Sequence, residues 1–284
     1  MTDALTTHLA HLRLRSLAPG TIANRSLGMR RLSRHLKIDP ADLLLVTPEQ
    51  LDLWQHSIVH LTPRYRASYL SCVFGFYAWA VETGILEEAP TSKLVKPKLP
   101  RGVPHPISEI DLDGALADAP DRLRPMLYLA AFAGLRAMEI AFLTREQVRD
   151  TSEPPMLRIA GKGNKERMVP LSDLLLTELR AYGLPSRGYL FLRSDSQAGC
   201  NSPARVSQIC NAYLHGRGIA ESLHSLRHRF GTRLYQLSTD LRMVQEVMGH
   251  SDPATTAGYA AYAPAAAVAA IERLGEHKRK EVVA

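Results

Sequence analysis

The sequence has few cysteines, no long apolar run and fewer acidic than basic side chains. Its three cysteines, Cys72, Cys200 and Cys210, show neither CxxC spacing nor a dense disulfide framework, so we predict no zinc site and a reducing compartment. The N-terminus, MTDALTTHLAHLRLR, lacks the apolar stretch of a signal peptide, and no segment is long and apolar enough to span a membrane. These absences predict a cytoplasmic protein.

The overall composition is that of an ordinary soluble globular protein, with 45% hydrophobic and 22% charged residues among 284. A chain of this length is long enough for two domains. Lysine and arginine number 35 against 28 acidic residues, so the formal charge is +7 and the pI is about 9.4. A basic balance favours polyanionic partners such as nucleic acid, although it identifies no site.

The clearest boundary lies at residues 93–108, KLVKPKLPRGVPHPIS. Four prolines forbid a continuing helix there, and Lys96, Lys98 and Arg101 add positive charge. We therefore predict one domain over residues 1–92, a basic linker over 93–108 and a second domain over 109–284.

The first domain shows helical signals throughout. Pro48 and Pro63 suit first turns, Thr47 with Gln50 resembles a capping box, and Gly84 suits a helix end. Between Pro63 and Gly84 apolar residues recur at helical spacing, which predicts a core face rather than a base-stacking surface; they are Tyr69, Val73, Phe76, Tyr77 and Ala80. A basic group crowds the end of an earlier helix, and alone it is equally a solvated face or a phosphate-contacting one; it consists of Arg30, Arg31, Arg34 and Lys37.

The second domain mixes helices with a hairpin. Two helices should join at Ala133–Gly134, the second beginning near Arg136. Residues 156–160 and 166–171 are β-prone runs flanking a turn at 161–165, which predicts a β-hairpin. A helix capped by Ser172 should follow, then a short strand at residues 189–192, YLFL, and helices to the end.

The segment LHSLRHRF, residues 223–230, gathers basic side chains on one helical face. His224, Arg227 and His228 are neighbours at spacings i, i+3 and i+4. Two histidines at i and i+4 can bind zinc, but a hydrolytic site needs a glutamate beside the first, where Ser225 stands. We favour an anion site, because the planar fork of Arg227 suits phosphate oxygens.

Other phosphate-directed residues occur elsewhere, each with an ordinary structural alternative. Arg136 follows a glycine turn at a helix start, where backbone N–H groups favour an anion, and Lys162 stands at the hairpin tip. Gly249 should end a helix directly before His250, and a further helix should carry Tyr259. Taken one at a time, each residue has an ordinary structural interpretation. Arg136 is then an exposed arginine, Lys162 a solvated lysine, His250 a capping histidine and Tyr259 a packing residue.

In this order the residues resemble the tyrosine recombinase (phage integrase) family, most of all compact Xer-type recombinases and small phage integrases. The motifs are GLRAMEI, GKGNKER, HSLRH and GHSDPATT, followed by Tyr259, and the resemblance covers nearly the whole chain. It implies a mainly α fold with a small antiparallel β-sheet. An all-helical, SAM-like core-site DNA-binding domain and an α+β catalytic domain would form a clamp around duplex DNA.

The resemblance also implies a mechanism that needs no metal, nucleotide or other cofactor. Tyr259 would attack a DNA phosphate and form a 3′-phosphotyrosyl link, with Tyr262 as the rival nucleophile. Arg136 and Arg227 would stabilise the transition-state charge, a role that suits their permanent charge. By family analogy Lys162 is the general acid. His224 and His250 would complete the phosphate-binding ring, with His224 the better candidate to accept the tyrosine proton.

With this resemblance the basic groups become expected DNA contacts: Arg30, Arg31, Arg34, Lys37, Lys96, Lys98 and Arg101. The C-terminal tail is expected to join protomers in a tetramer on DNA, with an accessory DNA-bending or directionality protein as a further partner, and no membrane. We favour a site-specific recombinase for integration and excision of a phage or mobile element. The alternatives are an Xer-type chromosome-dimer resolvase, a type IB topoisomerase and a non-catalytic DNA-binding protein.

Overall fold

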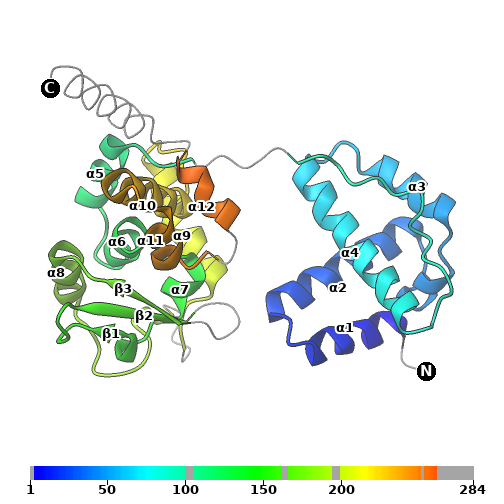
Figure 1. The fold of residues 1–284 in the computed structure, drawn as a ribbon, viewed down its shortest axis with the longest axis horizontal. Coiled ribbons are helices and arrows are strands. Elements are labelled where there is room, and N and C mark those ends of the chain that lie inside the picture. Colours follow the sequence, from blue (N-terminus) through cyan, green and yellow to red (C-terminus); the bar gives the residue numbers. More distant parts are fainter. Residues whose placement is uncertain (1–2, 100–104, 161–165, 194–198, 251–252, 261–284) are drawn as a thin grey trace, which may run out of the picture. The chain divides into compact units, whose positions relative to one another are not determined.

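The computed structural model describes residues 3–99, 105–160, 166–193, 199–250 and 253–260. The chain divides into two compact units, Met1–Arg101 and Gly102–Ala284, each built around its own hydrophobic core (Figure 1). The division falls inside the predicted linker. The functions assigned to the two predicted domains stay an interpretation of the sequence.

The described part of the first unit is entirely helical. Its elements are α1 (Ala4–Leu14), α2 (Pro19–Leu36), a 3-10 helix (Pro40–Leu45), α3 (Pro48–Ser57) and α4 (Pro63–Glu82). The predicted capping box is confirmed, because Gln50 N–H donates to Thr47 Oγ1 and Thr47 N–H donates to Gln50 Oε1. The predicted core face of α4 is buried at Val73, Phe76, Tyr77 and Ala80. Tyr69 lies half-buried at its margin, where its hydroxyl accepts a hydrogen bond from Arg31.

The second unit is a helical assembly that holds a small sheet at one end (Figure 1). Its helices are α5 (Glu109–Ala117), α6 (Arg124–Phe132), α7 (Ala137–Ala141), α8 (Asp173–Tyr182), α9 (Pro203–Gly216), α10 (Leu223–Ser238), α11 (Leu241–Met248) and α12 (Pro253–Ala260). A short 3-10 helix, Arg145–Gln147, precedes the sheet. Helix α10 packs along α6, and α11 and α12 pack against α10 and against each other. Helix α10 is therefore in contact with α6, α11 and α12.

The sheet is antiparallel, with strands in the order β1 (Val148–Arg149), β2 (Met156–Ala160) and β3 (Glu166–Pro170). The predicted hairpin is confirmed: Leu157 pairs with Val169 and Ile159 with Arg167. Alternate residues Leu157, Ile159 and Val169 face the core. The hairpin tip, residues 161–165, lies outside the described residues. Strand β1 was not predicted, because two residues are too short for a periodic signal.

The predicted strand at residues 189–192 is wrong. Tyr189 and Leu192 form isolated bridges to Thr144 and Cys200 instead of joining a sheet. The backbone N–H of Leu190 donates to Leu143 O, and that of Asn201 donates to Phe191 O. This apolar stretch is therefore anchored to surrounding loops, and its hydrophobicity reflects burial rather than strand pairing.

The fold is mainly α with a small antiparallel sheet, as predicted. Within the described ranges, no helix is long and apolar enough to cross a membrane.

Candidate active site

Arg136 is placed by a tight turn between α6 and α7. Gly134 adopts a positive φ of 63°, which glycine accommodates without strain, and Arg136 becomes the N-cap of α7. Its backbone N–H donates to Glu139 Oε2 at 2.7 Å and its Nη1 donates to Glu139 Oε1 at 3.0 Å. The side chain is 35% exposed, so its remaining donors can reach a ligand.

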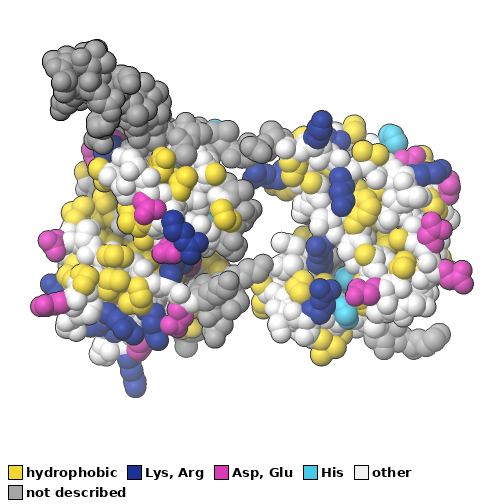
Figure 2. All heavy atoms as spheres, in the orientation of Figure 1, with side chains coloured by type: hydrophobic (Ala, Val, Ile, Leu, Met, Phe, Trp, Pro, Cys, Tyr) yellow, Lys and Arg dark blue, Asp and Glu magenta, His cyan; other side chains and the backbone are white. Residues whose placement is uncertain are grey.

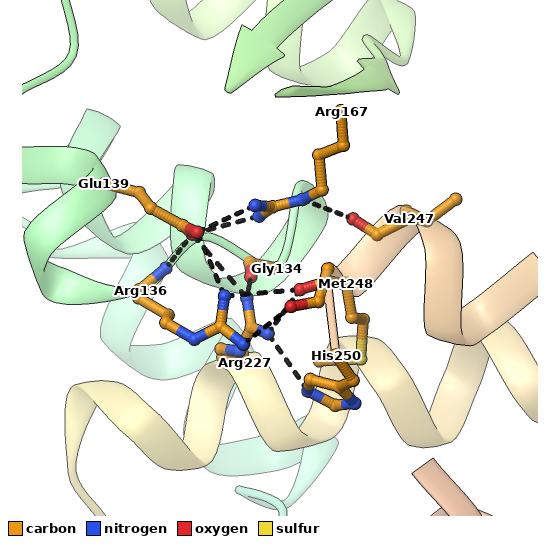
Figure 3. A network of polar contacts seen from close by, with 9 residues as sticks. Gly134, Arg136, Glu139, Arg167, Arg227, Val247, Met248 and His250 are labelled. Atoms are coloured by element: carbon orange, nitrogen blue, oxygen red, sulfur yellow. Dashed lines mark hydrogen bonds and ion pairs between the residues drawn. The ribbon is translucent and has the colours of Figure 1, made fainter. Parts of the chain in front are cut away.

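Glu139 is the centre of a polar network with three arginines (Figure 3). Arg167 of β3 donates two hydrogen bonds to its carboxylate, at 2.7 and 3.0 Å, and Arg227 Nη1 lies 3.7 Å from Oε2. The Glu139 side chain is 2% exposed. Burial raises its pKa, but the hydrogen bonds and charge of Arg167, with further contributions from Arg136 and Arg227, outweigh this and hold the pKa below its ordinary value. Three positive charges against one negative leave a surplus of two, which suits an anionic ligand.

Arg227 is held from several sides and is 1% exposed. It donates to Gly134 O, to Met248 O at 2.7 Å and to His250 Nε2 at 3.1 Å. Arg136 donates to Gly249 O at 3.2 Å, so both arginines engage the carbonyl end of α11, where the helix dipole is negative. Burial, followed by the charge of Arg136, lowers the pKa of Arg227 to about 9, and the side chain stays charged at neutral pH.

His250 follows α11 directly, because Gly249 takes a left-handed conformation with φ 63° and ends the helix. Since Arg227 is a donor, Nε2 of His250 must accept, and Nδ1 carries the proton that it shares with Thr256 Oγ1 at 3.0 Å. Burial and then the charge of Arg227 lower the pKa of His250 to about 4, so the ring is neutral at pH 7.

Tyr259 lies on α12 with its ring in a small core of Val244 and Met248. Its ring stacks on that of His250, with centroids 6.0 Å apart, and the residue is 1% exposed. Its hydroxyl lies 3.3 Å from Nδ1 of His228 on α10. Burial raises the Tyr259 pKa, and the charges of Arg227 and Arg136 partly offset that rise.

The structure therefore brings together four of the six predicted catalytic residues: Arg136, Arg227, His250 and Tyr259. His224 is exposed one turn before His228, and their rings meet edge to face with centroids 4.4 Å apart. Lys162 lies outside the described residues. Among the residues described, no three His, Cys, Asp or Glu side chains gather to hold a metal ion.

Three further residues of the site lay outside the predicted catalytic set. Glu139 stands three residues after Arg136, the position from which a glutamate can accept the backbone N–H of the residue that begins a helix, but no Ser or Thr stands at Arg136 to complete a capping box. His228 belongs to the same motif as His224, but the family resemblance assigned it no role. Arg167 has no sequence signal, because its importance depends on β3 lying beside α11.

The basic residues predicted to contact DNA all belong to the first unit. Arg30, Arg31, Arg34 and Lys37 are exposed at the end of α2, and Lys96 and Lys98 are exposed after α4. Arg31 lies over the Tyr69 ring at 5.2 Å and Lys96 over Phe74 at 4.6 Å. Figure 2 shows separate basic side chains over this unit rather than one continuous patch in that view. Arg101 lies outside the described residues.

Comparison with known proteins identifies the family. The phage integrase family matches residues 111–265, more than half of the chain. The tyrosine recombinase XerD of Pseudomonas aeruginosa is 34% identical over 214 residues, 69% of this chain and 70% of that protein. XerD of Vibrio vulnificus is 30% identical over 264 residues, 86% of each chain. The chain belongs to the phage integrase family and is a tyrosine recombinase, a site-specific recombinase enzyme.

Solved structures share the fold. The integrase of transposon Tn1549, in complex with transposon right end DNA, gives a TM-score of 0.67 at 16% identity, covering 96% of this chain and 100% of that one. A lambda integrase dimer bound to a core site gives 0.67 at 15% identity, covering 90% and 75%. At these identities the likeness concerns the fold alone.

Proposed function

We propose that this protein cleaves and rejoins DNA strands at specific sites through a 3′-phosphotyrosyl link to Tyr259. The observation that carries the proposal is the convergence of Arg136 and Arg227 on the end of α11, directly before His250 and beside the ring of Tyr259. A surplus of positive charge next to a phenol is what a phosphoryl transfer to tyrosine requires.

The proposed roles follow from residue chemistry. Arg136 and Arg227 bind the non-bridging oxygens of the scissile phosphate and stabilise the charge of the pentacovalent transition state. His250, held by Arg227 and Thr256, is proposed to complete the phosphate-binding ring; to donate to the phosphate, its Nε2 must first release the hydrogen bond from Arg227 and gain a proton. Lys162 is proposed as the acid that protonates the leaving 5′-oxygen, and His224 as a further phosphate ligand.

The phosphotyrosyl link conserves the energy of the broken phosphodiester, so a 5′-hydroxyl of a partner strand can attack it and reseal the DNA. We propose on this ground that strand exchange needs no metal ion or ATP. The reaction class also fits a protein that works in the cytoplasm, where its DNA is available.

Integration and excision of a phage or mobile element is the activity that we propose first. Resolution of chromosome dimers is the second candidate, and the identity to the XerD proteins favours it. The two differ in the location of the site: an attachment site beside the protein's own gene supports integration, and a site near the replication terminus supports resolution.

Covalent capture tests the proposal. The purified protein is incubated with a tiled library of nicked fragments from the region around its gene, quenched in denaturing detergent, and the attached DNA is sequenced. Wild type should capture a defined sequence through a 3′ end. Tyr259→Phe should bind the same DNA with no capture, whereas Tyr262→Phe should capture normally. Full capture by Tyr259→Phe would move the nucleophile elsewhere.

Plasmid relaxation and the capture assay separate the remaining alternatives. A type IB topoisomerase would relax arbitrary supercoiled plasmid without a second site, so site-dependent capture without relaxation excludes it. A non-catalytic DNA-binding protein would bind with salt-sensitive affinity and give no adduct with any fragment.

We further propose that both units contact duplex DNA as a clamp and that four protomers assemble on it, with a DNA-bending or directionality protein as an accessory. Support comes from the fold shared with recombinases solved on DNA. The tail, which lies outside the described residues, is the proposed link between protomers. Deleting residues 268–284 should leave binding to one site intact and reduce tetramer formation in sedimentation velocity, and normal recombination by the truncated protein would exclude this role.

A further inference from the structure

The hydroxyl of Tyr259 meets a histidine other than the one that the sequence motif suggested as its base. It lies 3.3 Å from Nδ1 of His228, four residues after His224 on α10. With Tyr259 1% exposed, bulk water does not surround the hydroxyl, so a proton leaving it needs a side-chain acceptor nearby.

A close approach between two helices fixes this contact. A Cβ atom added to Gly231 of α10 would lie 2.6 Å from Tyr259 Cζ and 2.6 Å from Met248 Sδ. The tyrosine ring therefore lies directly against the α10 backbone, three residues after His228. In that position the hydroxyl of Tyr259 lies beside the imidazole of His228.

A chain of contacts joins the phosphate-binding side of the site to this pair. Arg227 donates to His250 Nε2 at 3.1 Å, and the His250 ring stacks on the Tyr259 ring. The Tyr259 hydroxyl in turn lies 3.3 Å from His228 Nδ1. The reacting oxygen thus lies beside an imidazole that can accept its proton, on a ring that stacks against the histidine held by Arg227.

We propose that His228 is a catalytic residue that accepts the proton of Tyr259 when the phenol attacks DNA, an assignment that rests on the proposed function. The Oη–H bond breaks, an Nδ1–H bond forms on His228, and Oη bonds to phosphorus as the bond to the 5′-oxygen breaks. The departing oxygen takes its proton from the general acid. In the reverse step the deprotonated general acid takes the proton of the attacking 5′-hydroxyl, the bond between phosphorus and Oη breaks, and the His228 imidazolium returns its proton to Oη.

The surroundings of His228 keep its ring neutral before the reaction. Burial, then the neighbouring His224, Arg227 and His105, lower the pKa of His228 to about 4. The other titratable groups that face it are Tyr259 and His250. At pH 7 Nδ1 is therefore free to accept, provided that the ring proton is on Nε2.

A substrate with sulfur in place of the bridging 5′-oxygen isolates this step, because a thiolate leaves without a proton and the general acid is no longer needed. Single-turnover capture by wild type should vary little between pH 5.5 and 8. In His228→Asn the amide can accept a hydrogen bond but not a proton. Its capture rate should fall about a hundredfold or more at pH 7 and rise about tenfold per pH unit, since the phenol must ionise to solvent.

Two further variants separate a chemical role from a structural one. His224→Asn, one turn away, should keep the flat pH profile even where its rate falls. His228→Ala should regain capture as free imidazole is added, in proportion to the unprotonated base, and all rates are compared at equal folded fraction by circular dichroism.

A flat profile and a near-normal rate in His228→Asn would overturn the assignment, as would a steep profile in His224→Asn. Absence of any wild-type adduct would overturn the proposed function and this assignment with it.

Discussion

Arg167 donates two hydrogen bonds to Glu139, from Nη1 to Oε1 at 2.7 Å and from Nη2 to Oε2 at 3.0 Å. Its Nε donates to Val247 O at 2.8 Å, so one side chain links β3 to α7 and to the end of α11. Because Arg136 and Arg227 engage the same carboxylate and the same helix end, Arg167 and Glu139 fix the frame in which the two arginines are presented.

Removing the charge of Glu139 should destabilise the second unit. Glu139→Gln leaves Arg136, Arg167 and Arg227 close together without their shared counter-ion, and breaking a buried ion pair costs about 3 kcal/mol. Urea unfolding should show this loss in the free energy of unfolding. Glu146→Gln is the control, because that carboxylate lies at the surface and should leave the midpoint unchanged. Equal stability of Glu139→Gln and wild type would show that the network has no net structural effect.

The same carboxylate should give the protein a specific acid sensitivity. The pKa of Glu139 is lower in the folded chain than its ordinary value of 4.5. A group with a lowered folded pKa contributes stability above its unfolded pKa and loses it as the pH falls through the folded pKa. Stability of wild type should therefore decline below about pH 4.5 by a component that Glu139→Gln lacks. Parallel declines of the two proteins as the pH falls below about 4.5 would contradict this.

Loss of Arg136 should affect cleavage more than stability. Its side chain is 35% exposed, whereas Arg227 is 1% exposed and enclosed by Gly134, Met248 and His250. Arg136→Ala should reduce the covalent capture rate by about a hundredfold or more, by analogy with removing one oxyanion donor. Arg227→Ala should lose capture and stability together. A normal capture rate in Arg136→Ala would remove that arginine from the site.

Local signals in the sequence predicted most of the fold. The capping box at Thr47, the turn at Gly134 and the helix end at Gly249 each depend on residues within a few positions, and each is confirmed. The strand predicted at 189–192 failed because a short apolar run looks the same in sequence whether it is buried in a loop or paired in a sheet.

The candidate site was predicted less completely, for a related reason. The motif residues could be found one by one, but Arg167 matters through contacts with Glu139 and Val247, 28 and 80 residues away. The choice between His224 and His228 likewise depends on where α12 lies against α10, and spacing within one helix does not determine that.

DNA binding should be strongly salt-dependent, and the basic group at the end of α2 should account for part of the dependence. Removing one phosphate-binding side chain should reduce the slope of log K against log salt by about 1. Arg34→Ala is expected to do so equally on core-site and unrelated DNA, because a bond to phosphate carries no sequence information. Arg13→Ala, an exposed arginine of α1 outside that group, is the matched control. An unchanged slope in Arg34→Ala would place the α2 group away from DNA.

Adding a methyl group at Gly231 should displace the nucleophile. A Cβ atom there would meet Cζ of Tyr259 and Sδ of Met248, both at 2.6 Å. Both side chains are buried, so the added methyl group overpacks this small core and outweighs the better helix propensity of alanine; Gly231→Ala should lower the free energy of unfolding by about 1–3 kcal/mol, and its capture rate is compared with that of wild type at equal folded fraction.

The tyrosine ring must move away from α10 in that variant, and its hydroxyl then loses the contact with Nδ1 of His228. A displacement of this size can cost about a hundredfold in rate, so covalent capture should fall sharply while DNA binding persists. Gly216→Ala, at the end of α9 with no heavy atom near the added Cβ, should leave both capture and stability unchanged. If Gly231→Ala captures DNA as fast as wild type, the buried position of Tyr259 in this structure is not the one from which it reacts.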